Sequence, residues 1–264
     1  METHLEIRTK LPESDPHATP LLFVHGAWHD AWCWAEHFLP YFAQHDYISY
    51  ALDLRGHGKS QGRDRLRWTT IADYVSDIEQ VASQLERAPV LIGHSMGGLV
   101  VQKYLEKHTA PAAVLLASVP PSGALRTTLS IAVRHPLAFL KANLTLSLYP
   151  IIGTPALTRE AFFSPDMPEE KVQAYFARMQ DESYRAFLDM MIFSLPHPKR
   201  VNTPMLVLGG GRDRIFTRKE VEATGRAYGT QAEIFPTMAH DLMLEEGWQA
   251  VADRILVWLE ELGL

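Results

Sequence analysis

A serine lies between glycines at residues 93 to 98, where the sequence reads Gly-His-Ser-Met-Gly-Gly. An apolar run precedes Ser95 and a helical spacing of apolar residues follows it, so we expect the serine at a strand-to-helix turn. In such a turn, glycines two residues before and after the serine avoid collisions with the neighbouring strand and helix. The start of the helix adds free N–H groups and a positive dipole end, which stabilise nearby negative charge. The pattern predicts a nucleophilic serine, with an ordinary glycine-rich turn as the alternative.

A serine hydroxyl is a weak nucleophile at neutral pH, so it needs a base, and that base needs a carboxylate to fix its tautomer. His240 lies in a loop just after the apolar run ending at Phe235, and Asp213 follows the run 205–208 through a glycine-rich stretch. Open α/β sheets bind ligands in loops at the carboxyl ends of their strands. We therefore predict that Ser95, Asp213 and His240 form a catalytic triad. The alternatives are a structural histidine and an aspartate paired with a neighbouring arginine.

Two N–H groups must also point at the oxygen on which negative charge develops during attack by the serine. Met96, the residue after the serine, is expected to supply one of them. The loop after the apolar run 21–24 reads His-Gly-Ala-Trp, and we expect Ala27 to supply the second. Trp28 is expected on the wall of the substrate pocket, with simple core packing as the alternative.

Short apolar runs alternate with helical patterns along the chain. Nearly continuous hydrophobicity is typical of parallel strands buried on both faces. Residues 71–85 follow a helical period, with Thr70 and Asp73 placed to form a capping box, and residues 251–262 form a terminal amphipathic helix. The alternation predicts a mostly parallel, doubly wound α/β sheet. The predicted strands are Leu21 to Val24, Ile48 to Leu52, Val90 to Ile92, Ala113 to Ala117, Met205 to Leu208 and Ala232 to Phe235.

The alternation stops between residues 120 and 200, a distance too long for one crossover helix. Helical apolar faces and repeated prolines there predict several short helices that form a mobile cap. We therefore divide the chain into a core, residues 1–119 and 201–264, and a helical cap, residues 120–200. Met190 and Phe193 belong to a cluster of adaptable apolar side chains suited to an acyl or aromatic group, and we predict that they bind substrate. A structural layer with no role in binding is the alternative.

Composition excludes several classes of protein. Of the 264 residues, 47% are hydrophobic and 21% are charged, which is typical of a globular chain. The net charge of −6 supplies no basic field for a phosphate backbone, so nucleic acid is not expected as a partner. The single cysteine, Cys33, lies between Trp32 and Trp34, which predicts a packed, unreactive thiol and excludes an internal disulfide or a cysteine-based zinc site.

The sequence shows no obvious targeting signal or membrane anchor. Residues 1–6 lack the basic start and apolar stretch of a signal peptide, and charged residues and a proline interrupt the apolar region 129–148. We therefore expect a cytoplasmic protein without stable membrane insertion, present as a monomer or homodimer.

Several motifs resemble the α/β-hydrolase superfamily over nearly the whole chain, in particular the branch of serine esterases and monoacylglycerol lipases. They are HGAW at 25–28, DLRGHGKS at 53–60, GHSMGG at 93–98, Asp213 after a glycine-rich strand end, and His240, in the family's order of serine, acid and histidine. The stretch HGAWHDAWCW is also similar to the opening of plant methylesterases and hydroxynitrile lyases. In the superfamily the DxRGxGxS segment is a structural turn, so no chemical role is assigned to Asp53, Arg55 or His57.

The resemblance implies an α/β-hydrolase fold with an inserted helical cap. It also implies a serine hydrolase that cleaves small-molecule carboxylic esters through an acyl-enzyme, without a metal or organic cofactor. A C–C hydrolase, lyase or acyltransferase on the same scaffold is an alternative, as is a ligand-binding sensor with negligible turnover. Serine at position 95 argues against epoxide hydrolases and haloalkane dehalogenases, which have an aspartate there. Neither glycine cluster matches a dinucleotide or phosphate-loop pattern.

Overall fold

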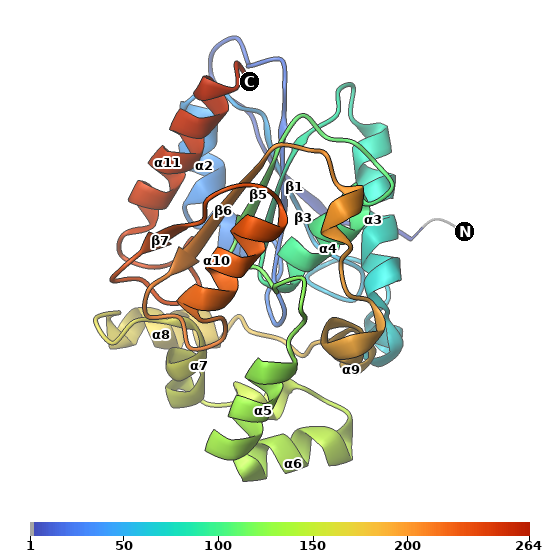
Figure 1. The fold of residues 1–264 in the computed structure, drawn as a ribbon, viewed down its shortest axis with the longest axis vertical. Coiled ribbons are helices and arrows are strands. Elements are labelled where there is room, and N and C mark those ends of the chain that lie inside the picture. Colours follow the sequence, from blue (N-terminus) through green and yellow to red (C-terminus); the bar gives the residue numbers. More distant parts are fainter. Residues whose placement is uncertain (1–2) are drawn as a thin grey trace.

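The computed structural model describes residues 3–264, which fold around one seven-stranded sheet in the order β1-β3-β2-β4-β5-β6-β7 (Figure 1). β1 pairs antiparallel with β3, and all other neighbours are parallel. This arrangement confirms the predicted mostly parallel sheet. The strands are β1 (Ile7–Lys10), β2 (Leu21–Val24), β3 (Ser49–Leu52), β4 (Val90–His94), β5 (Ala113–Leu116), β6 (Met205–Gly210) and β7 (Glu233–Phe235). Met1 and Glu2, which belong to the start predicted to carry no signal peptide, lie outside the described residues.

Helices follow most strands. They are α1 (Trp32–Ala35), α2 (Phe38–Gln44), α3 (Ile71–Gln84), α4 (Met96–Leu105), α5 (Leu125–Arg134), α6 (Pro136–Thr145), α7 (Pro155–Phe162), α8 (Glu169–Phe176), α9 (Tyr184–Leu188), α10 (Arg218–Ala227) and α11 (Trp248–Glu261). The shorter turns are η1 (Arg63–Trp68), η2 (Tyr149–Ile151), η4 (Pro198–Arg200) and a π-helical turn, η3 (Asp189–Phe193). The predicted capping box of α3 is present, since Thr70 Oγ1 accepts from the Asp73 N–H and the Asp73 carboxylate accepts from the Thr70 N–H. Within residues 3–264, no helix is long and apolar enough to span a membrane.

Alternate residues of the central strands enter two separate apolar layers. Phe23 and Ile92 pack with the layer that contains residues of α1, α2 and α11. Leu22 and Leu91 pack with the layer that contains residues of α3, α4 and α10. Both sides of the sheet are therefore covered, which explains the continuous apolar runs of these strands.

Two local features complete the core. Cys33 is fully buried, and Trp32 and Trp34 beside it belong to the same apolar layer, which confirms their predicted packing role. Sequence patterns alone miss β1, because this edge strand reads Ile-Arg-Thr-Lys and its residues are only half-buried or exposed. Charged residues at a sheet edge are common because they discourage pairing with another chain.

The helices α5 to α9 come between β5 and β6 and gather at one end of the sheet (Figure 1). At that end the chain meets the loops that follow the strands, since the Gln180 N–H donates to the Trp28 carbonyl after β2 at 3.0 Å. The helices in this region are short, as the repeated prolines of residues 120–200 predict. The boundaries of a separate cap, residues 120–200, stay a prediction.

Candidate active site

Ser95 occupies a sharp turn between β4 and α4. Its φ is +51° and its ψ is −117°, a backbone conformation that residues with a side chain rarely adopt. A Cβ atom at Gly93 would lie 2.7 Å from the Cα of Gly98, and one at Gly97 would strike the Val24 carbonyl. Glycine is therefore required at both positions for the strand, the turn and the helix to pack this closely.

We expect the substitution Ser95→Gly to make the fold more stable. Strain of the kind seen at Ser95 costs about 1–3 kcal/mol, and glycine adopts this backbone conformation freely. The extra freedom of glycine in the unfolded chain offsets part of the gain, so the free energy of unfolding should rise by about 1 kcal/mol. Chemical denaturation measures this change.

A matched substitution should have the opposite sign. Ser76→Gly places glycine at an exposed position in the middle of α3, where it should lower the free energy of unfolding by roughly 0.5 kcal/mol. If Ser95→Gly destabilised the protein as Ser76→Gly does, the turn would not be strained.

His240 and Asp213 are joined at the same end of the sheet. His240 Nδ1 lies 2.8 Å from Asp213 Oδ2, and both side chains are fully buried. The other carboxylate oxygen accepts from the N–H groups of Ile215 and Phe216 at 2.7 and 3.0 Å, which fixes its orientation. Since the carboxylate accepts the Nδ1 proton, the lone pair of the imidazole is left on Nε2. This atom is buried without a partner within residues 3–264, as expected of a base awaiting a proton.

Among residues 3–264, no hydrogen bond joins Ser95 to His240. His94, the residue before the serine, contacts His240 directly: its Nε2 lies 3.1 Å from the His240 carbonyl oxygen, and the two rings are 4.8 Å apart. Catalytic hydrogen bonds are often long without substrate and tighten when it binds.

Asp241 is the other acid next to His240, but its hydrogen-bond partner is a different histidine. Its Oδ2 lies 3.0 Å from Nε2 of His29, with both side chains fully buried. Of the two candidate carboxylates, Asp213 is therefore the one that contacts the predicted base.

The loop after β2 passes directly against the serine. A Cβ atom at Gly26 would lie 2.9 Å from the Cβ of Ser95, so only glycine fits there. Ala27 and Met96 line the same cavity as Ser95. Within residues 3–264 the N–H groups of Ala27 and Met96 donate no hydrogen bond, and their role toward an oxyanion stays a prediction.

The cavity above Ser95 is almost entirely apolar. It is lined by Ala27, Trp28, Ser95, Met96, Val119, Ala124, Thr127, Thr128, Ile131, Leu148, Ile151, Phe187, Met190, Ile215 and Phe216. Trp28 and Met190 are thus placed on the wall, as the sequence predicts. No charged side chain lines this cavity, which favours a neutral, apolar group of a ligand.

Phe193 is not brought to the cavity. Its side chain is 68% exposed, and the Arg185 guanidinium lies over its ring. Both Met190 and Phe193 belong to the single π-helical turn η3, whose Met190 faces inward while Phe193 faces outward. The prediction that Phe193 contacts substrate is therefore corrected, because neighbouring residues on a helical turn cannot all face one side.

Comparison with known proteins identifies the family. A model of the alpha/beta hydrolase family matches residues 21–254. The chain belongs to the alpha/beta hydrolase family. A monoacylglycerol lipase from Mycolicibacterium smegmatis is 24% identical to it over 270 residues, which cover 94% of this chain and 90% of that protein.

Solved structures of this alpha/beta hydrolase family share the fold. An esterase from Exiguobacterium antarcticum superposes with a TM-score of 0.76 at 18% identity, covering 98% of this chain and 96% of that one. A putative non-heme bromoperoxidase from Mycobacterium tuberculosis superposes with a TM-score of 0.78 at 17% identity, covering 99% and 97%.

The DxRGxGxS turn of this alpha/beta hydrolase is attached to α1 and α3. Asp53 accepts from the N–H groups of Ala31 and Lys59 at 2.8 and 3.0 Å, so it ties the turn to α1. Arg55 pairs with the buried Asp77 of α3 at 2.6 Å. These contacts agree with the expectation that the segment is a structural turn.

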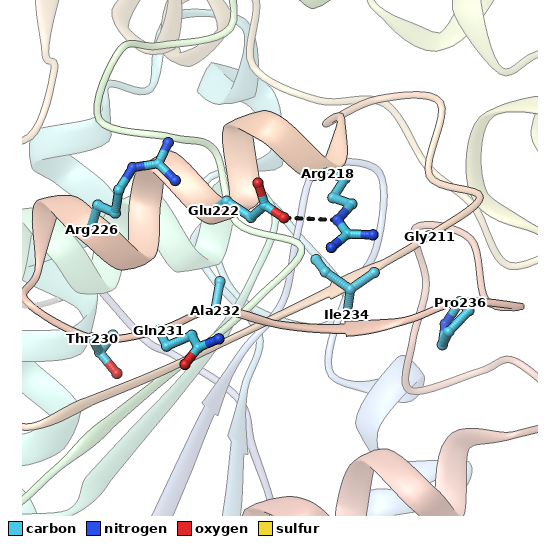
Figure 2. Close-up of a pocket in the computed structure, with 9 residues that line it drawn as sticks. All are labelled: Gly211, Arg218, Glu222, Arg226, Thr230, Gln231, Ala232, Ile234 and Pro236. Atoms are coloured by element: carbon cyan, nitrogen blue, oxygen red, sulfur yellow. Dashed lines mark hydrogen bonds and ion pairs between the residues drawn. The ribbon is translucent and has the colours of Figure 1, made fainter.

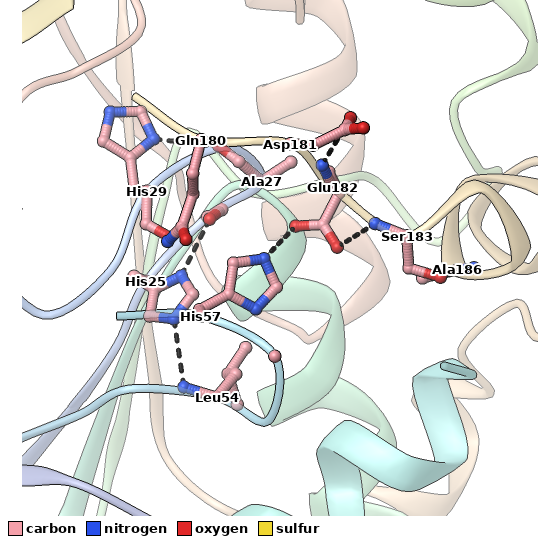
Figure 3. A network of polar contacts seen from close by, with 12 residues as sticks. His25, Ala27, His29, Leu54, His57, Gln180, Asp181, Glu182, Ser183 and Ala186 are labelled. Atoms are coloured by element: carbon pink, nitrogen blue, oxygen red, sulfur yellow. Dashed lines mark hydrogen bonds and ion pairs between the residues drawn. The ribbon is translucent and has the colours of Figure 1, made fainter. Parts of the chain in front are cut away.

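His57, from the same turn, binds the segment that leads into α9. Its Nε2 lies 3.0 Å from Glu182 Oε2 (Figure 3). Tyr74 donates to the other oxygen of this buried carboxylate at 2.7 Å. Burial lowers the pKa of His57, but the charge and hydrogen bond of Glu182 and the hydrogen bond to the Arg55 carbonyl together raise it, and the net shift is upward. A buried ion pair thus fixes the helical region to the core, and no sequence motif signalled Glu182.

Several cavity residues were also missed by sequence reasoning. Thr127, Thr128 and Ile131 come from one face of α5, whose helical spacing is visible in the sequence, although nothing there shows that this face covers Ser95. Their positions depend on how α5 packs, which is a long-range property.

One group of buried side chains in this alpha/beta hydrolase could be considered as a metal site. Among residues 3–264, ligand atoms of His94, His240 and Asp241 lie within 4.8 Å of one another. Ligands of one zinc ion are about 3.4 Å apart, because each is about 2.1 Å from the metal. His94 Nε2 is moreover already bonded to the His240 carbonyl, so we assign no metal to this group.

A second hollow lies on the surface of α10 and β7, lined by residues including Arg218, Glu222 and Arg226 (Figure 2). Arg218 is paired with Glu222 at 2.7 Å. No residue of the predicted triad lines this hollow, which is open and of mixed polar and apolar lining, so the apolar cavity at Ser95 is the candidate active site.

Proposed function

We propose that the protein is a serine hydrolase that cleaves carboxylic esters through an acyl-enzyme. The observation that carries the proposal is the buried His240–Asp213 hydrogen bond, which leaves Nε2 of His240 without a partner within residues 3–264. The strained backbone of Ser95 supports it. The relatives named as esterase and monoacylglycerol lipase support the same reaction class.

The proposed reaction starts with attack by Ser95 Oγ on the ester carbonyl carbon while its proton passes to His240 Nε2. The carbonyl oxygen becomes an oxyanion that accepts from the N–H groups of Ala27 and Met96. The bond to the alcohol then breaks, and His240 donates its proton to the departing alkoxide. Water next attacks the acyl-enzyme and loses its proton to His240. The bond between the acyl carbon and Ser95 Oγ then breaks, the acid is released, and His240 returns the proton to Ser95 Oγ. Asp213 stabilises the imidazolium in both steps.

The cavity argues for a neutral, apolar acyl group. Its lining holds aliphatic and aromatic side chains together with two threonines, and no side chain that would pair with a charged substrate. Small-molecule esters of uncharged acids therefore fit the site best.

A series of nitrophenyl esters graded by acyl length tests the proposal. We expect sustained multiple turnover of at least one ester and stoichiometric labelling of Ser95 by a fluorophosphonate. Labelling without turnover of any ester would favour a lyase, an acyltransferase, a C–C hydrolase or a ligand-binding sensor, and would reject the esterase.

Substitution of Met190 should change the preferred acyl length. Met190→Ala removes a 6% exposed side chain from the cavity wall and leaves space for extra methylene groups of the substrate. Because one methylene in an apolar pocket changes specificity by about 10-fold or more, the ratio of kcat/KM for longer against shorter acyl chains should rise by that factor. The same ester series measures it.

Phe193→Ala is the matched control, since it truncates an exposed side chain of the same turn. It should leave the acyl profile unchanged. An equal shift in both variants, or in neither, would show that the cavity beside Met190 does not hold the acyl group.

A further inference from the structure

His29 lies two residues after Ala27, and each nitrogen of its buried imidazole faces a hydrogen-bond acceptor. Its Nδ1 lies 2.8 Å from the Ala27 carbonyl oxygen, and its Nε2 lies 3.0 Å from Oδ2 of Asp241. A carbonyl oxygen can only accept, and so can an ionised carboxylate. Both ring nitrogens must therefore carry protons, which makes His29 an imidazolium paired with the Asp241 carboxylate.

The pKa directions of both partners support this charge state. Burial lowers the pKa of His29, but Asp241, together with the Ala27 carbonyl and Asp30, raises it, and the net shift is upward. Burial raises the pKa of Asp241, but His29, together with His94 and His240, lowers it, and the net shift is downward. Each partner thus stabilises the ionised form of the other.

His25, in the same loop, shows the contrasting state. Its Nδ1 donates to the Gly26 carbonyl at 2.9 Å, while its Nε2 accepts from the Leu54 N–H at 3.1 Å. One donor and one acceptor define a neutral imidazole, and burial lowers its pKa well below the ordinary value. Two buried histidines four residues apart therefore differ in charge because of their partners.

The ion pair joins the loop that holds the predicted base to the loop that holds the predicted oxyanion donor. Asp241 follows the predicted base His240, and His29 holds the carbonyl of Ala27, whose N–H is a predicted oxyanion donor. The helical region adds a third attachment, because Gln180 Nε2 donates to the His29 carbonyl at 2.9 Å (Figure 3). Residues 212 positions apart are thus fixed to each other by one buried contact.

We propose that His29 is a positioning residue, which acts through its ion pair with Asp241 to hold the Ala27 N–H in place for the oxyanion. This inference rests on the proposed function, since Ala27 has this role only if an oxyanion forms. An oxyanion contact is made mainly in the transition state, so misplacing its donor should lower kcat and leave KM nearly unchanged.

The charge of His29 gives the reaction a pH dependence with a defined sign. Since its folded pKa is raised, the imidazolium is present at low pH and is lost as pH rises through that pKa. The titratable groups around it are Asp241, His94, His25 and Asp30. Deprotonation of His29 removes one donor, so kcat should fall on the alkaline side.

The test compares His29→Gln, Asp241→Asn and the double variant with the unmodified protein, using the best ester substrate. We expect each single variant to lower kcat up to about 100-fold, with KM changed less than 3-fold, because a displacement of about 1 Å can cost 100-fold. The double variant should be no slower than the worse single variant, since both remove the same pair. The alkaline fall in kcat should disappear in His29→Gln.

His108→Gln is the control, because His108 makes a comparable contact with Glu79 on the surface at 2.9 Å. It should change neither kcat nor its pH profile. If His29→Gln lowers only thermal stability, with kcat and its alkaline limb unchanged, the positioning role is rejected.

Nitrogen NMR of labelled histidines tests the charge state independently of activity. We expect both ring nitrogens of His29 to be protonated at neutral pH in the folded protein, and one of them to lose its proton in Asp241→Asn. A neutral ring in the unmodified protein would overturn the inference even where a variant fails to fold. If the unmodified protein hydrolyses no ester but its His29 is an imidazolium, the proposed function fails while the ion pair stands.

Discussion

Ser95→Ala is expected to lower kcat for the best ester by about 10⁴-fold or more while the protein remains folded. The alanine keeps the Cβ atom of the strained turn but removes the only oxygen that can form the acyl-enzyme. Water would have to attack directly, with the base and the oxyanion donors still in place but no covalent intermediate. Steady-state turnover and fluorophosphonate labelling measure the loss, and no labelling is expected.

Ser83→Ala is the control for this substitution, because it removes a hydroxyl from the exposed surface of α3. Its turnover and labelling should match those of the unmodified protein. Near-normal ester hydrolysis by Ser95→Ala would refute the assignment of the nucleophile and, with it, the acyl-enzyme route.

Asp213→Asn is expected to reduce kcat by about 10⁴-fold, the second-largest effect. The carboxylate now accepts the Nδ1 proton of His240, whereas an amide can present its N–H group to that nitrogen. The proton would then move to Nε2, the atom that must accept the proton of Ser95. The pH profile of kcat and the burst of nitrophenol release measure the effect.

Asp241→Asn distinguishes the two neighbouring carboxylates. It removes the partner of His29 and leaves the Asp213–His240 contact intact, so its effect should be at least 10 times smaller than that of Asp213→Asn. If Asp241→Asn proved far more damaging, Asp241 would be the acid that orients the base.

Much of this arrangement could be predicted from local sequence. The strands β2 and β4 appear as continuous apolar runs because both faces of the sheet are covered. The turn at Ser95 is visible because backbone crowding there demands glycine at Gly93 and Gly97. Asp213 and His240 were predictable because parallel strands bring their carboxyl ends to one edge of a sheet.

The remaining features depend on contacts that local patterns do not encode. The pairing of His29 with Asp241 spans 212 positions, and neither residue belongs to a motif that names its partner. Met190 and Phe193 are similar in sequence context, yet the packing of one helical turn places one inside and the other outside. The edge strand β1 lacks an apolar pattern because part of it faces solvent.

The thiol of Cys33 can be used to measure how often the protein unfolds locally. It is fully buried, and burial raises its pKa well above the ordinary value, so it is kept in the unreactive protonated form. An aromatic disulfide reagent can therefore modify it only during excursions that expose α1, and the rate of modification reports how often they occur. The modification rate can be measured for every variant. A variant that is inactive but folded should keep the rate of the unmodified protein, whereas a variant that is inactive because it unfolds should react faster.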